Sequence, residues 1–472
     1  MLLILSSKNR PINLKATKNH SKYTDLRKRH QTFVYQSYSY SINNGRLEAS
    51  FLFQLDSIAV FNPTVVIPAR DFYNFELLPD SVLGNLVFHI GMVELISYWK
   101  AACPPQVVIK PHKLNREQVD FWKKLYYNGL GEFFYLNGIK TSVDDFMQIS
   151  SEGDYPERFN VKTDGSAVMV PVGGGKDSVV TLELLKKSGN RVVPMAMNPR
   201  EAVVRTIENA GFGMDESIVV ERTLDKKLLE LNARGYLNGH TPFSALLAFV
   251  TAFTAVISGI KYIALSNESS ANESTVPGSN INHQYSKSFE FEEDFNGYLS
   301  AFVTSGVKYF SFLRPLNELQ IGALFSIFKK HHFSFRSCNV GSKTDSWCGH
   351  CPKCLFTRII LGPFLGDEKL KAIFGKELFE DESLKPVFDE LTGNAYVKPF
   401  ECVGTPDEVN AAVSFMINKQ QSGPLPVLLK DYPVNEKGDR FAELLKEFNN
   451  EHNLPEIFET VLKENLKNLL WD

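Results

Sequence analysis

Residues 169–185 read MVPVGGGKDSVVTLELL, and this stretch decides the fold around which the chain is organised. Residues 167–172 form a short apolar run that is typical of a buried parallel strand. The glycine triplet at 173–175 follows with no separate turn, and apolar residues then recur at helical spacing through 179–187. The pattern predicts a strand, a glycine-rich loop and a helix, in that order.

The loop and the start of the helix carry the chemistry of a phosphate site. Glycines allow the backbone to approach a ligand closely, and the N–H groups at the start of a helix favour an anion. Lys176 adds a positive charge, Ser178 adds a hydroxyl donor, and Asp177 adds a carboxylate that could orient the loop or hold Mg²⁺. The expected phosphate contacts are Gly173, Gly174, Gly175, Lys176, Asp177 and Ser178.

The spacing of the glycines separates this loop from other phosphate-binding motifs. A Walker loop has four residues between its glycines, and here there are none. The sequence resembles the SGGxDS loop of the ATP pyrophosphatases (PP-loop enzymes), which split ATP into AMP and diphosphate. Gly173 stands in place of the usual first serine, so one hydroxyl donor is missing. The alternative is a glycine-rich turn that binds no ligand. The order of strand, loop and helix makes this alternative less favourable.

Length and charge limit the classes of protein that fit. A chain of 472 residues with 43% hydrophobic residues is long enough for two or three domains. The net charge of −3 gives no general attraction to nucleic acid. Residues 2–5 are too short for the core of a signal peptide. The uncharged run 241–260 opens with Thr-Pro and is better explained as a buried helix than as a membrane span.

Strands and helices alternate from residue 165 onward, which is the sign of a parallel sheet. We predict an α/β protein with a PP-loop domain at 161–370, a parallel sheet with helices on both faces. An α+β domain at 1–160 precedes it, with a hairpin at 33–55, and a mainly helical region at 371–472 follows. The other expected strands are 62–70, 192–197, 217–220, 262–265 and 310–316, and the expected helices are 83–100, 115–128, 201–210, 226–236, 241–260 and 318–328.

Ligands of such sheets bind outside the carboxyl ends of the strands. Three segments are expected at that edge: the glycine loop, Met197 with Asn198, and the polar stretch 266–273. Met197 and Asn198 are therefore further candidates for contact with the nucleotide. The polar stretch has neither helical nor strand periodicity, and its place after a buried strand favours a site over an ordinary surface loop.

Four of the six cysteines lie within 17 residues, with the spacing C-x9-C-x2-C-x2-C. They are Cys338, Cys348, Cys351 and Cys354. Four thiolates at this spacing suit a tetrahedral structural zinc ion, although an iron–sulfur cluster uses similar steps. Redox-active thiols are a weaker alternative. Metal spacing rather than a disulfide framework indicates a reducing cytoplasm.

The glycine loop, the Thr-Pro helix and the cysteine cluster together resemble the 7-cyano-7-deazaguanine synthases over about residues 165–360. A base-modifying or tRNA-modifying ATP pyrophosphatase is therefore one possible function, and a nonenzymatic zinc-knuckle binding module is another. A further resemblance spans nearly the whole chain, to the UDP-N-acetylmuramoyl-L-alanyl-L-glutamate epimerase family. It rests on GLGEFFY at 129–135, VGGGKDS at 172–178, SNESSANE at 266–273, NHQYSKS at 282–288 and KPFECVGT at 398–405.

The epimerase resemblance implies a cytoplasmic isomerase that uses ATP and Mg²⁺ on UDP-MurNAc-L-Ala-L-Glu. We expect neither nucleic acid nor a membrane as a partner, and the sequence does not indicate the oligomeric state. It does not identify the general base, for which the candidates are Glu268, Glu273, His240, His283, Lys287 and Cys402. His283 and Lys287 are four residues apart and would share one face of a helix. Arg314, at the end of an expected strand, is the candidate for neutralising a carboxylate or phosphate, with a surface ion pair as the alternative.

Overall fold

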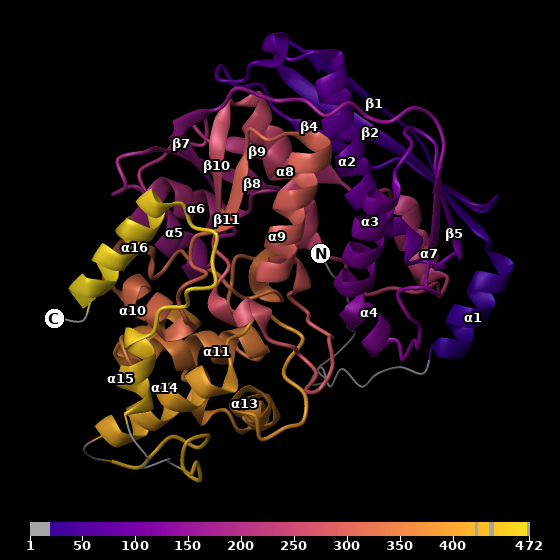
Figure 1. Cartoon of the computed structure of the whole chain (residues 1–472). Coiled ribbons are helices and arrows are strands. Elements are labelled where there is room, and N and C mark those ends of the chain that lie inside the picture. The colour runs from indigo at the N-terminus through magenta and orange to yellow at the C-terminus, as the bar shows by residue number, and fades with distance from the viewer. Residues whose placement is uncertain (1–18, 421–422, 434–438, 470–472) are drawn as a thin grey trace. The chain divides into compact units, whose positions relative to one another are not determined.

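The chain forms an α/β structure, whose helices and strands are drawn in Figure 1. It divides into two compact units, each built from three stretches of sequence. The structure is a computed structural model that describes residues 19–420, 423–433 and 439–469. The first unit contains 1–162, 220–259 and 280–306, and the second contains the rest.

The first unit is built on a long antiparallel hairpin, as the sequence predicts. β1 (Thr32–Asn43) and β2 (Arg46–Leu55) pair along their whole length, and Asn44 and Gly45 at the turn both have positive φ. Side chains alternate between the buried and exposed faces of β2, since successive residues of a strand point to opposite sides. This hairpin therefore presents an apolar face to the helices of the unit.

The sheet of the first unit is mixed, because parallel strands extend one edge of the hairpin and antiparallel strands the other. The strand order is β6-β5-β1-β2-β4-β9, and β3 also pairs with β2. The remaining strands are β3 (Ala59–Phe61), β4 (Thr64–Ile67), β5 (Gln106–Ile109), β6 (Gln148–Ser151) and β9 (Ile218–Thr223). The helices are α1 (His20–Arg29), α2 (Asp80–Trp99), α3 (Arg116–Gly129), α4 (Gly131–Leu136), α7 (Lys226–Ala233), α8 (Phe243–Ile257) and α9 (Phe289–Tyr298).

The two most apolar helices of this unit, α2 and α8, pack against each other in its core. The sequence predicts a helix at 83–100, and α2 is buried on nearly every side from Val82 to Trp99. It is long and apolar enough to cross a membrane, yet 94% of its most apolar window is buried inside the protein. A helix that is apolar all round belongs in a core, so α2 is the central helix of this unit.

The second unit contains a four-stranded parallel sheet in the order β8-β7-β10-β11. The strands are β7 (Asp164–Pro171), β8 (Arg191–Met197), β10 (Ile260–Leu265) and β11 (Lys308–Ser311). Each is buried through most of its length, as expected for the apolar runs of a parallel sheet.

Helices of the second unit share one large apolar core with this sheet. α5 (Lys176–Leu185) packs against β7, β8 and β10, and α10 and α16 pack against α5. The helices, several of which are labelled in Figure 1, are α5, α6 (Glu201–Asn209), α10 (Glu318–Ile327), α11 (Pro352–Leu361), α12 (Asp367–Phe374), α13 (Lys385–Thr392), α14 (Pro406–Lys419), α15 (Arg440–Lys446) and α16 (Glu456–Leu469).

The two units do not follow the three consecutive domains expected from the sequence. The long apolar helix α8 belongs with the N-terminal residues rather than with the glycine loop, and the helical C-terminal region shares its core with the loop's sheet. β9, expected as a parallel strand, pairs antiparallel with β4. An apolar helix or strand does not specify which sequence-distant partner will cover it, so local periodicity could not predict this assignment.

Candidate functional site

The order of the parallel strands creates a natural place for a ligand in the second unit. The chain leaves β7 toward β8 on one side, and β10 pairs with β7 on the other side. The carboxyl ends of β7 and β10 therefore flank a topological switch point, where ligands of such sheets bind. The glycine loop follows β7 and the polar stretch 266–273 follows β10, so the two most distinctive loops meet this criterion.

The three glycines of the loop have different structural requirements. Gly174 is buried with φ +80°, and a Cβ there would lie 3.0 Å from the backbone of both Ala202 and Val203 at the start of α6. Gly175 precedes the first residue of α5, and the Ser178 hydroxyl donates to its carbonyl at 2.9 Å. Gly173 is exposed, and a Cβ there would meet nothing within 4 Å. The open side of the loop thus lies at Gly173.

Replacing Gly174 with alanine should lower the free energy of unfolding by about 1–3 kcal/mol, because the new Cβ forces both a strained φ and a backbone clash. Gly173→Ser is the matched control, since the space around it is open. It should change stability by less than about 0.5 kcal/mol. Urea unfolding of both variants measures the difference, and equal effects would contradict this account of the loop.

Lys176 is the buried cation of the loop. Its ammonium lies 2.5 Å from an oxygen of Asp177 and also contacts the carboxylate of Glu318 at the start of α10. Burial opposes its charge, but the two carboxylates raise the pKa of Lys176 above its ordinary value. Burial raises the pKa of Glu318, and the nearby carboxylates of Asp177, Glu268 and Glu408 add to that rise. The group has more carboxylates than cations and lies beside the glycine loop.

The polar stretch 266–273 is held in place by Arg314. The Arg314 side chain is fully buried and donates to the backbone carbonyl of Glu268 at 2.8 Å and to the Ser311 hydroxyl at 3.2 Å. Asn267 also donates to the Ser311 hydroxyl, at 3.0 Å. The Glu268 side chain is 4% exposed and accepts a bond from Ser270 at 3.2 Å. Arg314 therefore fixes the backbone that presents Glu268.

The segment 398–405 connects the C-terminal helices to the same group of residues. The Glu408 carboxylate accepts the N–H of Glu318 at 2.7 Å and also caps α14 through the backbone and side chain of Thr405. Lys398 forms an ion pair with Glu273 at the end of the polar stretch. Glu408 thus fixes the start of α10, from which Glu318 reaches Lys176.

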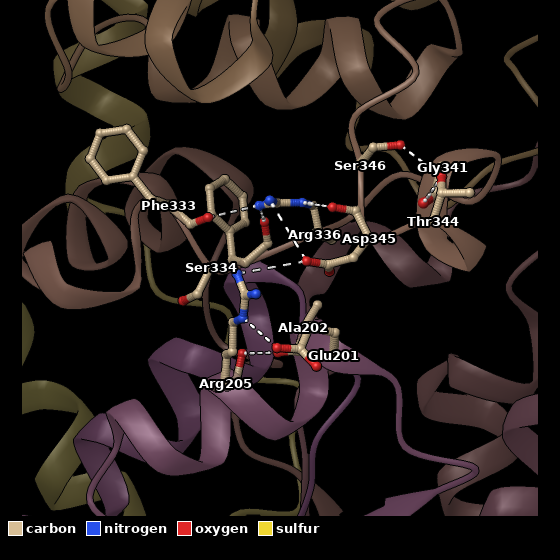
Figure 2. Close-up of polar contacts among 12 residues, drawn as sticks. Glu201, Ala202, Arg205, Phe333, Ser334, Arg336, Gly341, Thr344, Asp345 and Ser346 are labelled. Atoms are coloured by element: carbon tan, nitrogen blue, oxygen red, sulfur yellow. Dashed lines mark hydrogen bonds and ion pairs between the residues drawn. The ribbon is translucent and has the colours of Figure 1, made fainter.

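Hydrogen bonds and ion pairs tie α6 to the segment 336–345, which contains the first cysteine of the cluster (Figure 2). The Arg336 guanidinium donates to the Asp345 carbonyl at 3.0 Å, and Arg205 of α6 lies 3.8 Å from the Asp345 carboxylate. The Arg336 N–H donates to the carbonyl of Gly174 at 2.8 Å. The backbone of Arg336, two residues before Cys338, therefore holds the glycine loop at Gly174.

The four cysteines come together as the sequence predicts. Neighbouring Sγ atoms lie 3.8 Å (Cys338–Cys351), 3.7 Å (Cys348–Cys354) and 3.5 Å (Cys351–Cys354) apart. A disulfide would bring two sulfurs to about 2.05 Å, whereas thiolates around a tetrahedral zinc ion are about 3.8 Å apart. The backbone N–H of Gly341 also donates to the Cys338 sulfur at 3.1 Å. The geometry fits a closed, four-thiolate metal site.

A second cluster of metal-binding or acid–base side chains lies in the first unit. The Glu132 carboxylate is 2.5 Å from Nδ1 of His283 and 3.3 Å from Nδ1 of His240. Burial lowers the pKa of His240 well below its usual value, and the positive groups nearby, among them His283, Lys100 and Lys287, lower it further. Burial, with Arg222 nearby, lowers the pKa of Lys100 to about 8.

The structure thus separates the sequence candidates between the two units. The second unit contains the glycine loop, Glu268, Glu273, Arg314 and Cys402, whereas His240, His283 and Lys287 belong to the first. His283 and Lys287 do not share a helical face, because this segment forms only a short 3₁₀ turn at Tyr285–Lys287. The surface position considered for Arg314 is wrong, since its side chain is fully buried.

The remaining nucleotide candidates lie at the carboxyl end of β8. Met197 is its last residue and half-buried, and Asn198 follows with φ +47°. β8 neighbours β7 on the side away from β10, so these residues lie one strand from the switch point. Their contact with a nucleotide stays a prediction.

Sequence reasoning missed Glu318, Glu408 and Glu132. Glu318 and Glu408 each sit in the first turn of a helix, where a carboxylate is common for purely local reasons. Glu132 lies among the aromatic residues of 129–135, and such a cluster is more typical of a core than of a ligand set. Two of the sequence motifs could have pointed to these acids. The motif 129–135 contains Glu132, and the motif 398–405 ends three residues before Glu408.

Comparison with known proteins agrees with the epimerase resemblance. The family model described as the MurL N-terminal domain matches residues 24–312, and the MurL C-terminal domain matches 334–438. Three relatives are named UDP-N-acetyl-alpha-D-muramoyl-L-alanyl-L-glutamate epimerase. The one from Salinispora tropica is 32% identical over 410 residues, covering 84% of this chain and 86% of its own.

The other two relatives give the same picture. A Micromonospora protein is 32% identical over 413 residues, covering 85% of this chain and 90% of its own, and one from Xanthomonas oryzae pv. oryzae is 29% identical over 425 residues, covering 86% and 92%. The glycine loop and the polar stretch 266–273 fall within the N-terminal match, and 398–405 falls within the C-terminal one. With both matches spanning most of its sequence and these site segments included, the chain belongs to the MurL family.

Proposed function

We propose that this protein inverts the terminal L-glutamate of UDP-MurNAc-L-Ala-L-Glu to D-glutamate, with cleavage of ATP to AMP and diphosphate. Three relatives named for this epimerase activity, each matching 84–86% of the chain, carry the proposal. The glycine loop with its buried lysine supports the nucleotide part, because it combines a helix start with a cation at a sheet switch point.

The chemistry explains why an epimerase would use ATP. The α-proton beside a free carboxylate is barely acidic, since its removal gives a dianion. Transfer of AMP to the α-carboxylate removes that negative charge and leaves an acyl phosphate that stabilises an enolate. An activated N-acyl amino acid can also close to an oxazolone, whose α-proton is labile. A base removes the proton, an acid returns one to the opposite face, and water releases the product and AMP.

The positions of the side chains support the nucleotide roles that we propose. Gly173, the other loop glycines, Ser178 and the start of α5 would hold the ATP phosphates, and Lys176 would balance their charge. Asp177, which is more exposed than Glu318, would hold Mg²⁺, and the ion would neutralise phosphate charge. Met197 and Asn198 would contact the nucleotide from the end of the neighbouring strand.

Glu268 is our first candidate for the general base, because Arg314 fixes its backbone near the glycine loop's sheet edge. His283 and Cys402 are next, and Lys287 is retained as a further catalytic candidate. We assign Arg314 to positioning the polar stretch rather than to direct contact with the substrate carboxylate. Replacement of the true base should stop proton exchange while AMP formation continues, since adenylation is a separate step.

One incubation tests the proposal. The full chain is mixed with ATP, Mg²⁺ and UDP-MurNAc-L-Ala-L-Glu, and the glutamate is released and analysed on a chiral column. D-glutamate should accumulate with AMP, and only when ATP is present. If AMP forms but the glutamate stays entirely L, the ATP-cleaving part of the proposal survives and the epimerase part fails.

We further propose that the four cysteines hold a structural zinc ion, because four thiolates leave no open position for substrate. Cys351→Ser should lower the zinc content by about one ion per chain and lower the melting temperature, since the partial site loses metal that stabilises the fold. Elemental analysis and thermal unfolding measure both effects. Cys103→Ser removes a cysteine outside the cluster and should leave the zinc content unchanged. Iron in place of zinc, or no metal, would refute the assignment.

A further inference from the structure

Three distant stretches of the first unit meet at Glu132. The carboxylate lies on the short helix α4, His240 precedes α8, and His283 precedes the 3₁₀ turn at Tyr285–Lys287. Glu132 is 6% exposed by its side chain, and the histidines are 19% and 12% exposed. A carboxylate this buried requires partners, and among the described residues two imidazoles lie within ion-pair distance of it.

The backbone around the cluster is closely fitted, so the convergence is built into the fold. A Cβ at Gly129 would lie 2.7 Å from the Pro242 ring, and one at Gly239 would lie 2.9 Å from the Phe133 ring. The Asn137 amide donates to the carbonyls of Phe133 and Asn238, at 2.9 and 3.2 Å. These contacts fix the segment that carries His240 against the helix that carries Glu132.

The two imidazoles direct the same kind of atom toward the same oxygen. Nδ1 of His283 and Nδ1 of His240 both approach Oε2 of Glu132, and the two rings are 4.6 Å apart between centroids. All three donor atoms lie within 4.8 Å of one another. Two imidazole nitrogens and one carboxylate oxygen are the ligand set of many open zinc sites.

We propose that Glu132, His240 and His283 form a second metal site, which binds a zinc-like divalent transition ion. Ligand atoms around tetrahedral zinc are about 3.3 Å apart, which the Glu132–His240 separation of 3.3 Å matches. The Glu132–His283 separation is 2.5 Å, so these two atoms must move apart by about 0.8 Å when the ion enters.

Three protein ligands leave at least one position open on the ion, in contrast to the cysteine cluster. Two neutral imidazoles and one carboxylate leave the bound ion with a net positive charge. Lys100 and Lys287 lie near His240 and add to the positive charge. The open position is therefore suited to an anionic oxygen ligand, such as a carboxylate or a phosphate.

The same contacts could instead be two N–H groups that share one carboxylate oxygen, and metal content separates the two arrangements. The full chain is produced with zinc supplied, passed through a mild chelator and analysed for zinc. We expect about two zinc ions per chain, one from each cluster. His240→Ala and His283→Ala should each lose about one, and Cys351→Ser should lose the other.

His20→Ala is the matched control, because it removes an exposed imidazole of the same unit. It should leave the zinc content unchanged. Cobalt substitution adds a readout that does not depend on counting, because thiolate ligands give intense near-ultraviolet charge-transfer bands. The histidine variants should keep these bands while losing one bound cobalt, and Cys351→Ser should weaken them.

A zinc content of about one per chain that the histidine variants leave unchanged would overturn the proposal. Glu132 would then act only as a hydrogen-bond acceptor for the imidazoles. Glu132→Gln keeps the shape of the side chain but removes its charge, so it should bind zinc at least tenfold more weakly if the carboxylate is a ligand. Circular dichroism of each variant confirms that lost metal is not lost fold. These outcomes do not depend on whether the protein epimerises glutamate.

Discussion

Solvent deuterium should enter the α-position of the substrate glutamate only when ATP is present. Without transfer of AMP to the carboxylate, the enolate carries an extra negative charge. If this raises the barrier by about 8 kcal/mol, exchange slows by about a millionfold. Incubation in D₂O followed by mass spectrometry measures the exchange directly, with and without nucleotide.

Two controls sharpen this experiment. A nonhydrolysable ATP analogue should fill the site yet give no exchange, because it cannot transfer AMP if its α–β bridge is inert. His20→Ala should exchange normally, since it removes an exposed side chain that the proposed site does not include. Exchange at an equal rate without ATP would mean that the carboxylate need not be activated, and the adenylation mechanism would have to be abandoned.

Loss of the Lys176 charge should reduce AMP formation by about a thousandfold, which corresponds to about 4 kcal/mol of lost transition-state stabilisation. The single variant Lys176→Met cannot separate this loss of AMP formation from a loss of stability. It leaves the Glu318 carboxylate buried without its cation, and breaking a buried pair in this way costs about 3–5 kcal/mol.

The double variant Lys176→Met/Glu318→Gln separates the two effects, because it removes both charges of the pair. It should regain much of the lost melting temperature and still form little AMP. Lys187→Met is the control, since it removes an exposed lysine just beyond the end of α5. A folded double variant that forms AMP within tenfold of the unmodified protein would mean that Lys176 serves the fold alone.

The local elements around the glycine loop could be predicted from the sequence. Apolar runs and glycine spacing indicate β7 and α5, and the turn at Asn44 and Gly45 indicates the hairpin. α5 begins at Lys176, three residues earlier than its apolar spacing suggests, because helical backbone starts directly after Gly175. These features depend on interactions between residues close in sequence, which a single sequence records.

The partners of the site residues could not be predicted in the same way. Glu318 lies 142 residues from Lys176, and no periodicity connects them. The four cysteines were predictable because one short segment holds all of them, whereas Glu132, His240 and His283 come from three segments. The four-residue spacing of His283 and Lys287 predicts that they share one face of an α-helix. The segment forms only one 3₁₀ turn, at Tyr285–Lys287, so no such face exists.

The interleaving of the two units has a consequence for synthesis on the ribosome. The first unit is completed only by residues 280–306, and the parallel sheet of the second unit is completed only by β11. The first unit therefore cannot finish folding until about residue 306 has been made, and the second unit also needs the C-terminal helices that share its core. Domains that are continuous in sequence can instead fold in turn as they emerge. Nascent chains that stop before about residue 310 should expose apolar strands and depend on chaperones, and a cut at the boundary near residue 162 should yield fragments that do not fold alone.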